Sequence, residues 1–139
     1  MITYLDTSAL VKTIVAEPDT DAAIDLWNAS DVRLTSLITY AEARAALAAA
    51  SRDRRLVGRA RAAARDALDD RWLDLSDAVV SDEVVHLAGD LADRAGLRGY
   101  DAVHLATAML VGPTDVVFAT WDSALAEAAA SAGLVTAGV

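Results

Sequence analysis

The chain has 139 residues, of which 21 are acidic and 12 are basic, so its formal net charge is −9. This length is typical of one domain with its own hydrophobic core, and we expect a single domain over residues 1–139. The absence of cysteine excludes disulfides, thiolate metal sites and cysteine nucleophiles. The acidic balance argues against binding nucleic acid by general charge attraction. It leaves room for a metal-dependent enzyme, because a bound cation reverses the local sign of a site.

The apolar segments are too short for targeting or membrane insertion. The residues before Asp6 lack the basic region and the longer apolar run of a signal peptide. No apolar run approaches the roughly 20 residues that a membrane-spanning helix needs. We therefore expect a cytoplasmic protein that does not contact membranes.

Predicted strands and helices alternate along the chain. Apolar runs bounded by turn residues predict strands over residues 2–5, 32–35, 72–75, 116–119 and 134–136. Apolar residues at helical spacing predict helices over residues 9–15, 20–27, 37–47, 56–68, 82–95, 100–110 and 124–132. The alternation favours an α/β fold, in which helices cover both faces of a central, mostly parallel sheet.

Capping and turn residues mark the boundaries of these elements. Thr7 or Ser8 is a suitable N-cap for the first helix, and Pro18 lies just beyond its end. Gly96 stands where the helix over residues 82–95 ends, and Gly112-Pro113 terminates the next helix. No internal repeat, linker or low-complexity segment interrupts this order.

Four acids occupy positions from which they can converge. Asp6 and Asp122 each follow an apolar strand and precede a helix, so both face the crevice at the carboxyl edge of the sheet. Asp101 lies in the first turn of a helix, and Glu42 lies on the helix after the second strand. Each acid alone also has an ordinary interpretation, as a helix cap, a partner of the helix dipole or a solvent-exposed residue.

Convergence of these carboxylates requires compensation. Two unit charges about 4 Å apart repel by ~1 kcal/mol in water and by ~4 kcal/mol at an effective dielectric of about 20. Lys12 is the single lysine of the chain, so a bound cation is the natural counter-charge. Oxygen ligands without thiolates select Mg²⁺ or Mn²⁺, and such ions support phosphoryl-transfer chemistry.

For the other notable polar and aromatic residues, the sequence favours structural roles over functional ones. Half of the basic residues lie in one segment: Arg52, Arg54, Arg55, Arg59, Arg61 and Arg65. Such a cluster steers a phosphate backbone or forms a solvated helix face, and the second is the more common. His104 follows Asp101 by one helical turn, so a role as a base is open, but its apolar helix favours a structural role. We expect core or interface positions for Trp27, Trp72 and Trp121.

Four segments carry a resemblance to a known family. They are LDTSALVK at residues 5–12, AEA at 41–43, RGYDAVHLATA at 98–108 and ATWD at 119–122. In order and spacing they resemble the PIN-domain ribonucleases, and more narrowly the VapC toxins of bacterial and archaeal toxin–antitoxin pairs. The resemblance spans essentially the whole chain. It implies a PIN-like three-layer α/β/α sandwich.

The same resemblance implies an activity, a site and partners. The activity is that of a metal-dependent endoribonuclease, the toxin of a type II toxin–antitoxin pair, which hydrolyses RNA phosphodiesters with Mg²⁺ or Mn²⁺. The acidic quartet of the family, catalytic and metal-binding, corresponds to Asp6, Glu42, Asp101 and Asp122. The supporting hydroxyls of the family correspond to Ser8 and Thr120. The implied partners are a second copy of the chain, an RNA substrate and a VapB-like antitoxin that covers the cleft.

Two alternative functions remain open at this point. A PIN-like module without activity would only bind partners, although the intact quartet speaks against it. A phosphatase with Asp6 as its nucleophile would resemble haloacid-dehalogenase-like proteins. Those proteins need a second acid two residues further on, and this chain has Ser8 there.

Overall fold

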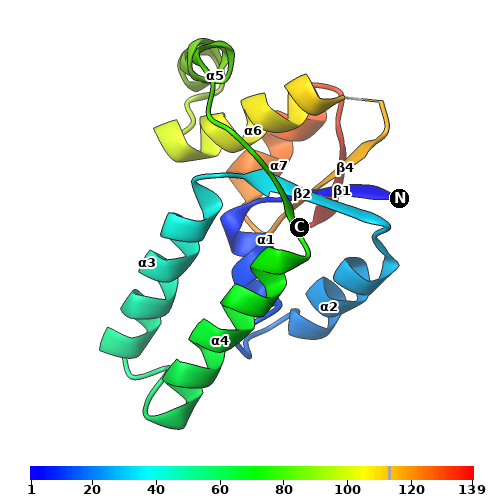
Figure 1. The fold of residues 1–139 in the computed structure, drawn as a ribbon. Coiled ribbons are helices and arrows are strands. Elements are labelled where there is room, and N and C mark those ends of the chain that lie inside the picture. Colours follow the sequence, from blue (N-terminus) through cyan, green and yellow to red (C-terminus); the bar gives the residue numbers. More distant parts are fainter. Residues whose placement is uncertain (113) are drawn as a thin grey trace.

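A parallel sheet forms the middle layer of the protein (Figure 1). The structure is a computed structural model, and it describes residues 1–112 and 114–139. The strands are β1 (Ile2–Leu5), β2 (Val32–Ser36), β3 (Ser76–Ala78), β4 (Val116–Thr120) and β5 (Val135–Gly138). They lie in the order β3-β2-β1-β4-β5, and every neighbouring pair is parallel. The predicted α/β class with a central parallel sheet is confirmed.

Helices cover both faces of this sheet, as Figure 1 shows. One face carries α1 (Thr7–Lys12), α2 (Thr20–Ala29), α3 (Thr39–Arg52) and α4 (Arg59–Leu73). The other face carries α5 (Asp82–Ala95), α6 (Gly99–Val111) and α7 (Ser123–Ser131). Within residues 1–112 and 114–139, no helix has the length and apolar character needed to cross a membrane. The three layers match the predicted α/β/α sandwich.

The alternation of side chains along the strands divides the core into two clusters. Tyr4 and Phe118 point toward α5, α6 and α7, and their rings stack with centroids 5.4 Å apart. Leu5 and Ala119, the next residues along the same strands, point toward the other helical layer. Both central strands are therefore buried on both sides, which holds their carboxyl ends rigidly in place.

The direction of the chain across the sheet reverses between β1 and β4. The chain passes from β1 to β2 and β3 on one side, then returns to β4 and β5 on the other side. In open α/β sheets, a crevice forms outside the carboxyl ends of the strands at such a reversal. Asp6 directly follows β1, and Asp122 lies two residues beyond β4. The topology therefore places both acids at the usual position of a ligand site.

The predicted strand over residues 72–75 is wrong. Helix α4 extends over the first two of these residues, and the third strand of the sequence is Ser76–Ala78. Ala64, Leu68 and Trp72 recur every four residues and all pack into the same core cluster. Trp72 thus continues the buried face of a helix. The true strand lies at the edge of the sheet and is polar, so hydrophobicity gave no signal for it.

Other predicted boundaries differ by a few residues. The second strand continues through Ser36, so α3 begins at Thr39. The first helix ends at Lys12, and α4 covers later residues than the 56–68 that were predicted. Pro113, which was predicted to help end α6, lies outside the described residues. These shifts leave the order of the elements unchanged.

The six arginines of the basic segment lie on the hairpin that α3 and α4 form (Figure 1). All six are exposed: Arg52, Arg54, Arg55, Arg59, Arg61 and Arg65. None of them lines the crevice at the carboxyl ends of β1 and β4. Their exposure agrees with the solvated helix face that the sequence favours.

The buried face of α6 supplies a direct test of the packing. Leu105 is fully buried, whereas Leu110 on the same helix is 42% exposed. Leu105→Ala should lower the free energy of unfolding by about 2–5 kcal/mol, because it leaves a cavity in the core. Leu110→Ala should cost less than about 1 kcal/mol. Urea denaturation measures both, and equal losses would contradict the assigned face.

Candidate active site

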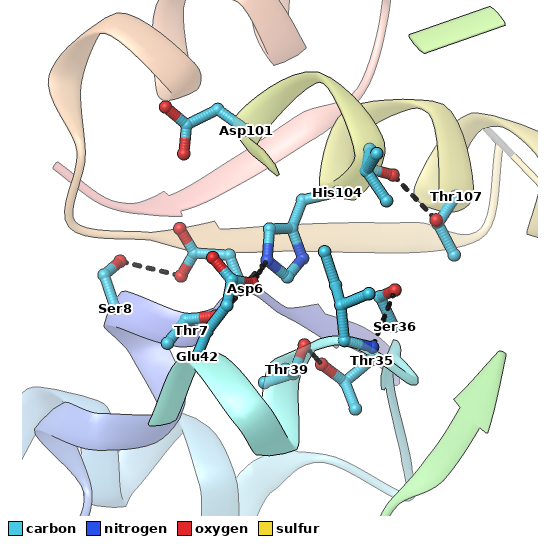
Figure 2. Close-up of polar contacts among 12 residues, drawn as sticks. Asp6, Thr7, Ser8, Thr35, Ser36, Thr39, Glu42, Asp101, His104 and Thr107 are labelled. Atoms are coloured by element: carbon cyan, nitrogen blue, oxygen red, sulfur yellow. Dashed lines mark hydrogen bonds and ion pairs between the residues drawn. The ribbon is translucent and has the colours of Figure 1, made fainter. Parts of the chain in front are cut away.

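One pocket of about 420 Å³ lies at the carboxyl ends of β1 and β4. Its lining includes all four acids that the sequence singled out: Asp6, Glu42, Asp101 and Asp122. They come from four separate parts of the chain, and Figure 2 shows three of them, Asp6, Glu42 and Asp101, to one side of His104. The predicted convergence of these carboxylates on one pocket is therefore observed.

Asp6 is held by hydrogen bonds to both of its carboxylate oxygens. The Ser8 hydroxyl and the Ala9 backbone N–H donate to Oδ1 at 2.7 and 2.8 Å, and the Thr120 hydroxyl donates to Oδ2 at 2.6 Å. Asp6 is therefore the N-cap of α1, and the predicted caps at Thr7 or Ser8 are wrong. Burial raises the pKa of Asp6 above its usual value even though these bonds oppose the shift.

The two predicted supporting hydroxyls join the ends of β1 and β4. The Ser8 hydroxyl donates to Asp6 and accepts from the Trp121 backbone N–H at 2.9 Å. The Thr120 hydroxyl donates to Asp6 and accepts from the Asp122 backbone N–H at 3.0 Å. Each hydroxyl thus fixes a pocket acid to the neighbouring strand end.

Asp101 and Asp122 share one counter-charge, the guanidinium of Arg98. Arg98 Nε lies 2.8 Å from Asp101 Oδ2, and Arg98 Nη2 lies 3.4 Å from Asp122 Oδ2. The Arg98 side chain is 75% exposed, so solvent screens both ion pairs. Lys12, the single lysine, was the candidate counter-charge in the sequence, and no role was predicted for Arg98. Lys12 instead pairs with Glu17 at 3.0 Å.

Glu42 faces the pocket, which excludes its alternative interpretation as a solvent-exposed residue. Its Oε1 accepts a hydrogen bond from the Thr7 hydroxyl at 2.9 Å and lies 2.7 Å from His104 Nε2. Burial alone would raise the pKa of Glu42, but the bonds to His104 and Thr7 outweigh it and lower the pKa below its usual value. Glu42 is therefore held as a carboxylate.

His104 is buried between the core and the pocket (Figure 2). Its Nδ1 lies 2.9 Å from the Tyr4 hydroxyl, and its Nε2 contacts Glu42. The sequence favoured a purely structural histidine and missed the contact with Glu42. The available signal was the one-turn spacing from Asp101, because residues three apart share a helix face.

The tryptophans all pack against the core, and one of them also borders the pocket. Trp27 is buried and Trp72 is partly buried in the core beside α3 and α4, as predicted. Trp121 lines the pocket, and the Lys12 ammonium lies 5.6 Å from its ring centroid. The core prediction is therefore correct for all three, since Trp121 also packs against this core cluster, and Trp121 in addition borders the candidate site.

The donor chemistry of the pocket suits a hard cation, but its acids are not arranged as a ready coordination shell. Among residues 1–112 and 114–139, no three acidic, histidine or cysteine side chains are arranged to hold a metal ion. The pocket offers carboxylate oxygens and no thiolate, which is the chemistry that Mg²⁺ and Mn²⁺ prefer. Arg98 occupies the space between Asp101 and Asp122, and its pairs are solvent-exposed. An entering cation would therefore replace a weakly held guanidinium.

Comparisons with known proteins identify the family. The PIN domain family matches residues 3–131. Ribonuclease VapC49 from Mycobacterium tuberculosis (strain ATCC 25618 / H37Rv) is 40% identical over 132 residues, which cover 95% of this chain and 92% of the relative. The crystal structure of Mycobacterium tuberculosis VapC20, described as a Sarcin-Ricin loop cleaving toxin, aligns over 96% of both chains with a TM-score of 0.72 and 21% identity.

A second solved structure, a member of the VapBC family of toxin-antitoxin systems (VapBC-5) from Mycobacterium tuberculosis, has a TM-score of 0.67 and 22% identity. The alignment covers 99% of this chain and 98% of that chain. At these identities the two structures establish the shared fold. The family match and the 40%-identical relative show that the chain belongs to the PIN-domain family and, within it, to the VapC group.

The buried position of Asp6 predicts how pH affects the metal-free protein. Because burial raises the pKa of Asp6, the folded state holds this proton more strongly than the unfolded state. The resulting stabilisation is complete below the unfolded pKa and is lost as pH rises through the folded pKa. In EDTA, the melting temperature of Asp6→Asn relative to wild type should therefore increase by several degrees from pH 4 to pH 8. A pH-independent difference would contradict the raised pKa.

Proposed function

We propose that this protein is a metal-dependent endoribonuclease and the toxin of a type II toxin–antitoxin pair. The observation that carries the proposal is the gathering of four carboxylates around one pocket in a chain of the VapC group. The ribonuclease name of the 40%-identical relative supports RNA as the substrate. The crevice at the reversal of strand order provides an open site for a phosphodiester.

Each acid has a proposed role that follows from its position. Asp6 and Asp101 would hold Mg²⁺ or Mn²⁺, and Glu42 and Asp122 would complete the cluster or orient the attacking water. A bound divalent cation supplies positive charge to the phosphate and makes water more acidic. Ser8 and Thr120 keep Asp6 oriented through their hydrogen bonds.

The proposed partners follow from the family. We propose that a VapB-like antitoxin covers the pocket, that RNA occupies it when the antitoxin is absent, and that two copies of the chain form a dimer. The VapBC-5 structure supports the antitoxin, since it is a member of the VapBC family of toxin-antitoxin systems. A cytoplasmic location agrees with a chain that has no cysteine.

A partner-binding module without catalysis remains the second candidate. The current pairing of Arg98 with Asp101 and Asp122 favours it, because these acids are neutralised without a metal. The phosphatase alternative is weaker. The position that would hold its second acid is Ser8, which donates a hydrogen bond to the supposed nucleophile Asp6.

Asp101→Asn tests the metal site and the activity together. Wild-type protein, freed of antitoxin, should melt at a temperature several degrees higher in millimolar Mn²⁺, since a ligand at one hundred times its dissociation constant adds ~2.7 kcal/mol. Asp101→Asn should fold, gain less from Mn²⁺ and lose RNA cleavage. Asp93→Asn, on the exposed surface of α5, is the matched control and should behave as wild type. An Asp101→Asn protein that cleaves RNA normally would overturn the assigned site.

Arg98→Gln tests whether the guanidinium competes with metal. Its removal should tighten Mn²⁺ binding by the RNA-free protein about two- to fivefold, because solvent-exposed ion pairs contribute roughly 0.2–1 kcal/mol. Arg94→Gln removes the same charge from α5 and should leave Mn²⁺ affinity nearly unchanged. Isothermal titration calorimetry measures both variants. Unchanged or weaker binding by Arg98→Gln would show that Arg98 is not a competitor.

A further inference from the structure

We infer that His104 is a positioning residue, which orients Glu42 for metal binding through a hydrogen bond from Nε2–H to Glu42 Oε1. The inference rests on the proposed function and adds to it a residue outside the acidic quartet. The bond joins α6 to α3 across the pocket, and the two heavy atoms are 2.7 Å apart. His104 acts through Glu42 in this account and does not touch the substrate.

The His104 ring is fixed at both nitrogens. Nδ1 lies 2.9 Å from the hydroxyl of Tyr4, which is fully buried on the central strand. Tyr4 is itself immobilised by stacking on Phe118. Tyr4 and Phe118 both belong to the core, so Tyr4 cannot move to follow the imidazole. The ring therefore has no other orientation that keeps its contacts with Tyr4 and Glu42. A rigid ring can hold a flexible carboxylate in one position.

The hydrogen bonds define which nitrogen carries the proton. Glu42 Oε1 is a carboxylate oxygen, which can only accept, so its 2.7 Å contact with Nε2 requires a proton on that nitrogen. In the neutral ring Nδ1 then carries no proton and accepts a hydrogen bond from the Tyr4 hydroxyl, 2.9 Å away. This tautomer is assigned from the hydrogen-bond partners.

Glu42 receives both of its side-chain donors on the same oxygen. The Thr7 hydroxyl and His104 Nε2 lie 2.9 and 2.7 Å from Oε1, so Oε2 is the oxygen available to an ion in the pocket. A free glutamate side chain would lose conformational entropy on binding a cation. His104 and Thr7 remove part of that loss by ordering Glu42 in advance.

The position of His104 favours a role in positioning Glu42 over a role as a general base. The side chain is only 2% exposed, and its two ring nitrogens already contact Tyr4 and Glu42. A general base must reach the proton that it removes from a nucleophile. His104 lies one turn behind Asp101 on α6, on the core side of the acids (Figure 2). With both ring nitrogens already engaged, His104 supports the ligand Glu42 in this account.

Two amide substitutions distinguish the contacts of His104. The amide nitrogen of Gln occupies the place of Nε2 and can still donate to Glu42, whereas the shorter Asn side chain reaches only toward Tyr4. His104→Asn should weaken Mn²⁺ binding by about tenfold or more, as is typical when a ligand loses its supporting hydrogen bond. His104→Gln should stay within about threefold of wild type.

Calorimetry with Mn²⁺ as the probe, on protein shown by melting to be folded, measures these affinities. In a Glu42→Gln background, His104→Asn should change the affinity less than about twofold, since its effect passes through Glu42. Suppose that wild type binds Mn²⁺ but His104→Asn binds it as tightly as His104→Gln, or more tightly. The inference then fails while the proposed function stands. If wild type does not bind Mn²⁺, both fail.

A measurement on the wild type alone covers the case in which His104→Asn does not fold. Nitrogen-15 NMR of the imidazole ring reports which nitrogen carries the proton. The inference requires a proton on Nε2, the nitrogen that faces Glu42. A ring protonated on Nδ1 alone would overturn the inference, because Nε2 would then have no hydrogen to donate to Glu42.

Discussion

Electrostatic repulsion among four carboxylates in one pocket is the constraint on which the rest of the site depends. Two unit charges about 4 Å apart at an effective dielectric of about 20 would repel by ~4 kcal/mol. Asp6 accepts three hydrogen bonds, and Glu42 accepts two. Asp101 and Asp122 share the guanidinium of Arg98. The fold thus neutralises two acids with an exposed guanidinium and orients the other two with hydrogen bonds.

The fold holds the carboxyl ends of the two central strands, and with them Asp6, in fixed positions. The two central strands are buried on both faces, and their carboxyl ends lie next to each other at the reversal of strand order. Hydroxyls of Ser8 and Thr120 join these ends, so Asp6 is fixed from both strands. Helix α6 carries Asp101 near its start and His104 one turn later. Arg98, just before α6, is the exposed member of the site.

Much of the fold and of the site follows from sequence patterns, for identifiable reasons. Apolar strands that end in an acid are local signals, so the placement of Asp6 and Asp122 was predictable. The polar edge strand at 76–78 was not predictable, because it buries little apolar surface. The apolar residues at 72–75, beginning with Trp72, gave a false strand signal just before it. The roles of Arg98 and His104 depend on contacts between separate elements, which spacing along one helix only suggests.

Anomalous diffraction from crystals grown with Mn²⁺, recorded at the manganese edge, tests the central claim most directly. The claim is that the four acids form one cation site once the guanidinium is displaced. The account predicts a manganese peak in the pocket at about 2–2.5 Å from carboxylate oxygens of Asp6 and Asp101, with Arg98 turned away from the acids. A pocket without manganese at millimolar Mn²⁺, with Arg98 still paired to Asp101 and Asp122, would contradict it.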